Sequence, residues 1–114
     1  MGLFWKSDSD YIIEDIQDLV GKINQELLTM QDSLVANNGA SPNNIVELSE
    51  IHERLAKLQN QVEAKMDQLS SSKQAKLMVP WIDGRYFPFT MWALSYNMAV
   101  NKLRMAVQKY ANNI

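Results

Sequence analysis

Cysteine is absent from this chain of 114 residues, and histidine occurs only once. The absence of cysteine excludes a disulfide framework, a thiolate nucleophile and a zinc finger. The single His52 opens the segment His-Glu-Arg-Leu-Ala, but Ala56 stands where a helical zinc-protease motif requires its second histidine. The four glycines form no phosphate-binding loop, and no Gly-x-Ser-x-Gly turn is present. We therefore expect no enzyme, no cofactor and no metal site.

A strong excess of positive charge is also missing. The formal net charge is −2 and the isoelectric point is about 5.3, whereas nucleic-acid binding requires clustered lysine and arginine. Polar and acidic residues follow position 6 directly, so no secretory leader is predicted. The longest uncharged run, residues 86–101, is shorter than the roughly 20 residues that a membrane-spanning helix needs. These absences predict a cytoplasmic protein that does not bind nucleic acid.

Apolar residues at alternating spacings of three and four dominate two long stretches of the chain. This spacing is typical of a helix that buries one apolar seam against a neighbour. The first stretch contains Ile13, Ile16, Val20, Ile23, Leu27, Met30 and Leu34, and the second contains Leu48, Ile51, Leu55, Leu58, Val62 and Leu69.

Capping signals set the limits of both helices. Ser7 and Asp10 have the spacing of a capping box, and the Asn-Asn-Gly sequence that ends at Gly39 favours a left-handed turn. The proline at position 42 suits the first turn of a second helix. We therefore expect helices over residues 8–37 and 42–70, joined by a short linker into an antiparallel coiled-coil hairpin.

The three consecutive serines at 70–72 interrupt the second heptad. Two interpretations remain open at this point. Ser71 and Gln74 have the spacing to cap a short new helix that ends near Met78, or the second helix runs on through the serines.

Residues 80–88 form the one segment with a distinct non-helical character. Its Asp-Gly pair predicts a tight turn, and Pro80 and Pro88 limit any strands beside that turn to two or three residues. We therefore expect a clasp rather than a sheet.

A third helix is expected over residues 90–111. It carries a methionine every seven residues beside a second apolar stripe. The methionines are Met91, Met98 and Met105, and the second stripe contains Trp92, Tyr96, Ala99, Leu103, Ala106 and Tyr110. The fold class is thus all-α, a single domain over residues 1–114 in which the third helix buttresses the hairpin.

The two stripes of the third helix are together wider than one hairpin groove can bury. A row of methionines either fills an irregular core or forms an adaptable surface for an apolar partner helix. Our leading hypothesis is a non-enzymatic protein–protein interaction module, an adaptor, assembly factor or chaperone-like protein that binds a partner or self-associates as a homo-oligomer. The expected contact residues are Trp81, Tyr86, Phe87, Phe89, Met91, Trp92, Met98 and Met105.

A second hypothesis places the N-terminal residues at a membrane. Leu3, Phe4 and Trp5 precede Lys6, a combination that favours a bilayer interface, although so short a segment anchors weakly. The alternative for these residues is packing against the end of the bundle.

A third hypothesis is an inhibitor or immunity-type protein that acts through an acidic face. Residues 1–37 hold two basic and seven acidic residues, a net charge of −5, and Asp10, Glu14 and Asp18 follow one another along one helix face. Residues 85–114 hold four basic residues and no acidic one. This separation of charge fits either helix-dipole complementation or pairing between helices or subunits.

Overall fold

Reciprocal hydrogen bonds fix the start of the first helix. The computed structural model describes residues 7–113, and in it α1 (Asp8–Ala36) follows Ser7. The backbone N–H of Ser7 donates to Asp10 Oδ2 (3.1 Å), and the Ser7 hydroxyl oxygen accepts from the backbone N–H of Asp10 (3.2 Å). This confirms the predicted capping box, which satisfies backbone donors that a helix start leaves unpaired.

The turn after α1 is organised by a buried asparagine. Asn44 accepts from the backbone N–H of Ser41 (2.7 Å), and its side-chain amide donates to the carbonyl oxygens of Gly39 (2.9 Å) and Ser33 (3.3 Å). Because Asn44 holds residues 42–44 in turns, α2 (Ile45–Met66) begins at Ile45. The expected start at position 42 was therefore wrong by three residues.

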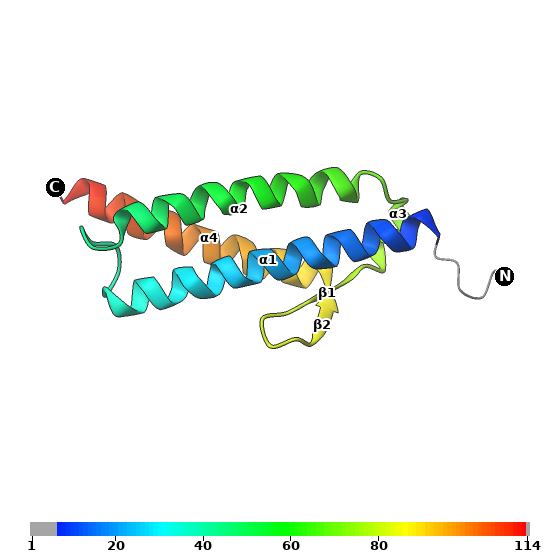
Figure 1. Cartoon of the computed structure of the whole chain (residues 1–114), viewed down its shortest axis with the longest axis horizontal. Coiled ribbons are helices and arrows are strands. Elements are labelled where there is room, and N and C mark those ends of the chain that lie inside the picture. Colours follow the sequence, from blue (N-terminus) through cyan, green and yellow to red (C-terminus); the bar gives the residue numbers. More distant parts are fainter. Residues whose placement is uncertain (1–6, 114) are drawn as a thin grey trace.

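The predicted antiparallel hairpin is confirmed (Figure 1). Most seam residues of α1 and α2 are buried in one continuous core. The fully buried members from the two helices are Ile16, Val20, Ile23, Leu48, Ile51, Leu55 and Val62. The sequence pattern thus identified the correct face of each helix.

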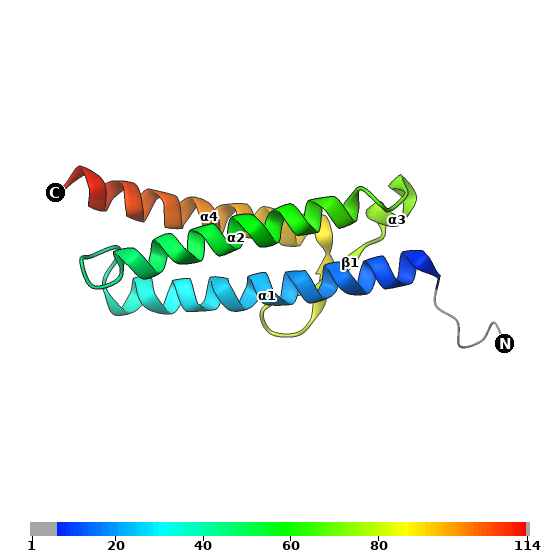
Figure 2. The same ribbon diagram turned by 45° about the horizontal axis from the view of Figure 1, so that its top comes forward.

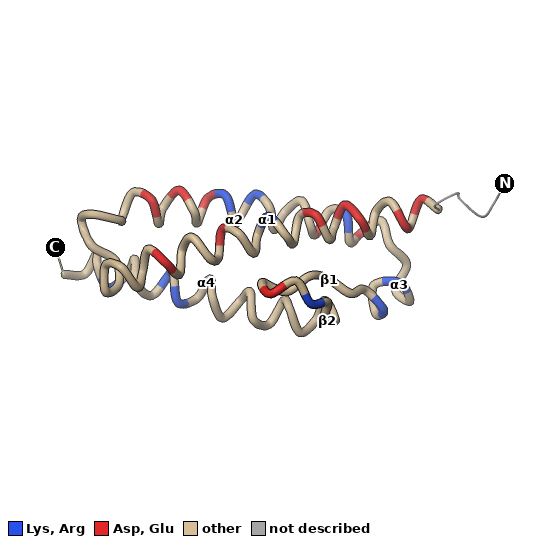
Figure 3. The backbone as a smooth tube through the Cα atoms, turned by 60° about the horizontal axis from the view of Figure 1, so that its bottom comes forward, with Lys and Arg blue, Asp and Glu red and all other residues tan. Residues whose placement is uncertain are grey.

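Ion pairs join α1 to α2 at the surface. Arg54 Nε lies 2.9 Å from Glu26 Oε2, and Lys65 Nζ lies 3.0 Å from Asp15 Oδ2. The acidic residues concentrate on these two helices, as Figure 3 shows along the backbone. Some acids of α1 are therefore paired with bases of α2. The bases near the C-terminus form none of these pairs.

The second helix ends at Met66, four residues before the expected end at residue 70. Ser70 then caps a short helix, α3 (Ser71–Ala75), because its hydroxyl oxygen accepts from the backbone N–H of Lys73 (3.3 Å). The side-chain amide of Gln74 donates to the carbonyl oxygens of Met66 (2.8 Å) and Leu69 (3.1 Å). These bonds satisfy a carbonyl at the end of α2 and another in the turn that follows it, which favours a break over a continuous helix. The new helix begins after Ser70 and ends before Met78.

A small β-hairpin connects α3 to the last helix. Strands β1 (Met78–Pro80) and β2 (Tyr86–Pro88) pair antiparallel, with Val79 opposite Phe87. Their three-residue length agrees with the limit expected from the prolines, but they do pair as a sheet, so the expectation of a clasp without a sheet was wrong. The backbone hydrogen bonding continues beyond both prolines. The backbone N–H of Trp81 donates to the carbonyl oxygen of Arg85 (2.6 Å), and the backbone N–H of Phe89 donates to the carbonyl oxygen of Leu77 (2.9 Å).

The last helix, α4 (Phe89–Asn112), packs along α2 and runs antiparallel to it (Figure 2). It buries Trp92, Tyr96 and Leu103 in the common core. The all-α fold with a third buttressing helix is confirmed. In the part of the chain that the structure describes, no helix combines the length and the apolar character that crossing a bilayer requires.

We expect Asn44→Ala to lower the free energy of unfolding by about 1–3 kcal/mol, because it removes a buried side chain that bonds groups on both sides of the turn. Urea denaturation followed by circular dichroism measures this change. Asn43→Ala alters an exposed neighbour in the same turn and is the matched control. Equal unfolding midpoints for the two variants would contradict the role assigned to Asn44.

Candidate functional site

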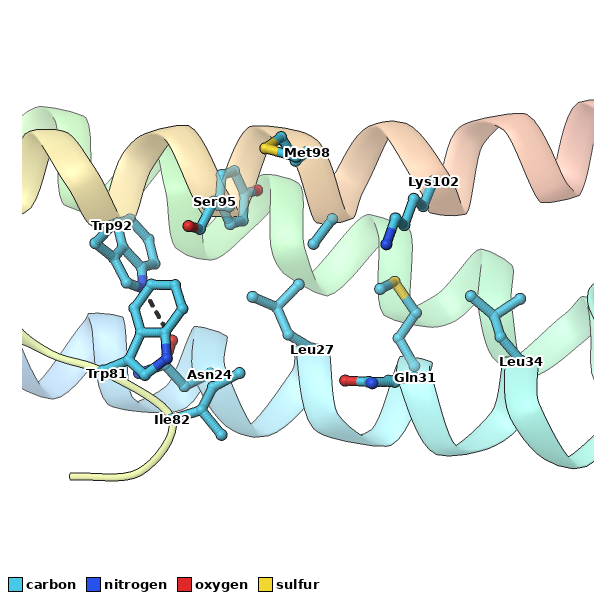
Figure 4. A pocket seen from close by; sticks show the side chains of 13 residues that line it. Asn24, Leu27, Gln31, Leu34, Trp81, Ile82, Trp92, Ser95, Met98 and Lys102 are labelled. Carbon is cyan, nitrogen blue, oxygen red and sulfur yellow. Dashed lines mark hydrogen bonds between the residues drawn. The ribbon is translucent and has the colours of Figure 1, made fainter. Parts of the chain in front are cut away.

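An apolar groove of about 300 Å³ lies between α1 and α4. Leu27, Met30 and Leu34 line it from α1, and Trp81 and Ile82 stand at one end (Figure 4). The α4 side of the groove is lined by Trp92, Ser95, Tyr96, Met98, Ala99 and Lys102. Lys102 is the only charged side chain among the residues that line the groove.

One buried asparagine connects the elements around this groove. The amide of Asn24 on α1 donates to the carbonyl oxygen of Pro80 (2.9 Å), and Asn24 Oδ1 accepts from Nε1 of Trp92 on α4 (2.9 Å). The second bond is the dashed line in Figure 4. Buried polar groups require partners, so these bonds hold β1 and α4 at fixed positions relative to α1. The groove is therefore set by directional bonds as well as by apolar packing.

The aromatic residues at the start of α4 form a stack. Trp92 lies between Phe89 and Tyr96, with ring-centroid distances of 5.6 and 5.3 Å. Trp92 is only 1% exposed. Trp92, which was expected among the contact residues, is therefore a core residue that also lines the groove, and its indole N–H donates to Asn24.

Burial also affects the ionisation of Tyr96. Removal of its phenol from water raises the pKa of Tyr96, and the negative charge of Glu63 raises it further. Both effects favour the neutral phenol in the folded chain.

The loop of the β-hairpin is held by contacts of its own. The rings of Trp81 and Phe87 meet edge to face at 5.7 Å, and the guanidinium of Arg85 lies 5.4 Å from the centroid of Phe87. The Asp83 carboxylate accepts the backbone N–H of Arg85 (3.0 Å) and its Nε–H (2.6 Å), which lowers the pKa of Asp83. Gly84 adopts a φ of +88°, as a tight turn requires. The expected Asp-Gly turn is thus present.

The methionine row of α4 lies at the surface. Met91, Met98 and Met105 are between 54% and 67% exposed. Leu94, which was not among the expected contact residues, is 67% exposed on the same row. The sequence could have placed Leu94 in this row. Leu94 lies three residues after Met91 and four before Met98, the same spacing that identified the seams of the first two helices.

The other expected contact residues in and beside the β-hairpin do not all lie on the same side of it. Trp81, Phe87 and Met91 line, with Ser95, a hollow of about 250 Å³ that shares Trp81 and Ser95 with the groove. Phe89 is half-buried against the core. Tyr86 is exposed, but it lines a different depression, above α1.

Two of the three acidic residues expected to follow one face of the first helix line that second depression. Glu14 and Asp18 line it together with Lys22, so a base stands among the acids. Asp10 belongs to the capping box of α1. Leu3, Phe4 and Trp5, which the second hypothesis places at a membrane, lie outside the described residues.

The charge of α4 is opposite in sign to that of the α1–α2 hairpin. The helix carries Lys102, Arg104 and Lys109 and no acidic residue. Within residues 7–113 none of these three bases forms an ion pair. Lys109 lies two helical turns after Lys102 on the same side of α4.

Comparisons with protein-family models, with curated proteins and with solved structures found no match to this chain. Among the described residues, no group of three histidine, aspartate or glutamate side chains is arranged to hold a metal ion.

Replacement of Asn24 by alanine is expected to lower the free energy of unfolding by about 2–5 kcal/mol, because it leaves the Trp92 N–H and the Pro80 carbonyl without partners. Urea titration gives the free energy, and near-ultraviolet circular dichroism reports the environment of Trp92. The exposed neighbour is the control, so Gln25→Ala should match the wild type. A loss below about 0.5 kcal/mol for Asn24→Ala would mean that packing alone holds α4.

Alkaline pH should destabilise the chain partly through Tyr96. An unfolded tyrosine ionises near pH 10, whereas the folded chain keeps Tyr96 neutral to higher pH. The contribution of neutral Tyr96 to the free energy of unfolding is therefore fully present below about pH 10. It is lost as the pH rises toward the raised pKa of the folded state. Urea midpoints measured from pH 8 to pH 11 should fall less steeply for Tyr96→Phe than for the wild type. Parallel declines would contradict this assignment.

Proposed function

We propose that this chain is a protein–protein interaction module without catalytic activity of its own. Its binding surface consists of the exposed row of α4, namely Met91, Leu94, Met98 and Met105, and of the adjoining Trp81 and Phe87 in the β-hairpin. This set is called the α4 surface below. The partner is another protein or a second copy of the chain.

The observation that carries the proposal is the exposure of a row with coiled-coil spacing. Spacings of three and four bury an apolar seam in α1 and α2, yet the row on α4 has no covering element within residues 7–113. Isolated apolar residues are common on protein surfaces, but a regular row beside an apolar groove is typical of an interaction site. Helix α4 already buries its aromatic face, so the row is a second apolar face.

The composition of the row suits recognition of an apolar surface. Methionine is unbranched and polarizable, and it adapts to partners of differing shape. The groove and the hollow supply concave surface on both sides of Trp81. Together they provide the pockets into which a partner's anchoring side chains insert.

Substitution of exposed residues tests the proposal without disturbing the core. Met98→Glu and Leu94→Glu should leave the free energy of unfolding, measured by urea titration, within about 0.5 kcal/mol of the wild-type value, because both side chains are exposed. Each should abolish retention of a partner by the immobilised full chain from an extract of its source organism, or reduce the oligomer seen by light scattering.

The matched control is Val46→Glu on α2. Val46 is 67% exposed, like Met98 and Leu94, but it does not line the groove or the hollow. It should retain the wild-type partner and oligomer. Unchanged partner retention and unchanged oligomeric state in both α4 variants would reject the α4 surface as a binding site.

A further inference from the structure

We propose that the groove between α1 and α4 receives an amphipathic helix of another protein, whose carboxylates flank its apolar face. This inference rests on the proposed interaction function and specifies the partner.

The shape of the groove favours a helical occupant. Its two long walls are helices, and Leu27, Met30 and Leu34 form apolar lining along about two turns of α1. Because α4 packs along α2, the side of α4 that faces α1 remains open. A helix laid in this space would contact both walls, as the fourth helix does in a four-helix bundle.

The β-hairpin offers little to an extended peptide. Addition of a strand requires unpaired backbone donors and acceptors at a sheet edge. The carbonyl oxygens of Met78 and Pro80 in β1 already accept bonds from Gln17 (3.0 Å) and Asn24 (2.9 Å). In β2, Pro88 has no N–H to donate. Both strands are also only three residues long, so a helix in the groove is the better fit.

The charges specify carboxylates on the partner. Lys102 lines the groove, and Lys109 continues the same side of α4, without an ion pair to any described residue. Across the groove, the polar residues of α1 are the uncharged Asn24 and Gln31. An incoming helix with aspartate or glutamate beside its apolar face would pair with both lysines, whereas a basic helix would be repelled.

A second copy of α4 does not supply these carboxylates. The helix has no acidic residue from Phe89 to Asn112, so two copies paired through this face would add lysines to lysines. This repulsion favours a partner of different sequence over self-pairing of α4.

The experiment selects a helix from a library and asks what charges it carries. The full chain is immobilised, and displayed helical peptides of about 20 residues, roughly 30 Å long, are selected for binding. Every peptide has a fixed apolar stripe at spacings of three and four. The positions that flank the stripe are randomised among aspartate, glutamate, lysine, arginine, glutamine and serine.

Selection on the wild-type chain should enrich aspartate and glutamate over lysine and arginine at the flanking positions. Fluorescence anisotropy with the best synthetic peptide should then show about a tenfold weaker affinity for the Lys102→Glu, Lys109→Glu double variant. Exchange of the peptide carboxylates for lysine should restore binding to that variant. Wild-type affinity should fall as the salt concentration rises.

A second double variant controls for net charge. Lys57→Glu with Lys76→Glu changes the charge of the chain by the same amount at two exposed lysines outside the groove. It should change the peptide affinity less than about twofold. Far-ultraviolet circular dichroism of both double variants should match the wild type, because all four lysines are exposed.

The outcomes separate this inference from the proposed function. Equal effects of the two double variants, or a selection without acidic enrichment, overturn the acidic helix. The α4 surface still stands in that case if Met98→Glu abolishes retention of the native partner. Selected acidic peptides that bind Met98→Glu as tightly as wild type place the binding site elsewhere, and they overturn the inference as well.

Discussion

The hydrogen bonds of one buried amide hold the arrangement on which the rest of this structure depends. Asn24 faces apolar surroundings, and its cost of burial is offset only because it bonds both Trp92 on α4 and Pro80 on β1. Apolar packing alone is nondirectional and permits a helix to slide or rotate. A bond between a side chain on α1 and an indole N–H on α4 allows only one register. The groove and the exposed face of α4 follow from that register.

The aromatic face of α4 is held in the core, and this determines which residues of α4 remain exposed. A helix that presents Trp92 and Tyr96 to the core must direct the row that contains Met91 and Met98 away from the buried centre, since the two sets occupy different faces. The sequence of α4 is apolar on more of its circumference than α2 covers. This excess apolar face distinguishes α4 from the two hairpin helices, whose seams are buried against each other.

The charged residues are also distributed differently between α4 and the two hairpin helices. The hairpin helices carry most of the acidic residues, and Arg54 and Lys65 of α2 pair with two of those on α1. The bases of α4 remain outside these pairs, and Lys102 stands at an apolar groove. An apolar surface bordered by charge of one sign gains selectivity from electrostatics and affinity from burial.

The sequence by itself determined the hairpin, the capped start of α1 and the position of the tight turn, because heptad spacing and capping chemistry act over a few neighbouring residues. It also indicated that α4 has too much apolar surface. Only the tertiary structure decided that Trp92 is buried while Leu94 is exposed, since this depends on Asn24, which lies 68 residues away in the chain. The late start of α2 likewise depends on Asn44 reaching back to Ser33. Local patterns specify helices and their apolar faces, whereas the choice between two apolar faces of one helix requires a contact from a distant part of the chain.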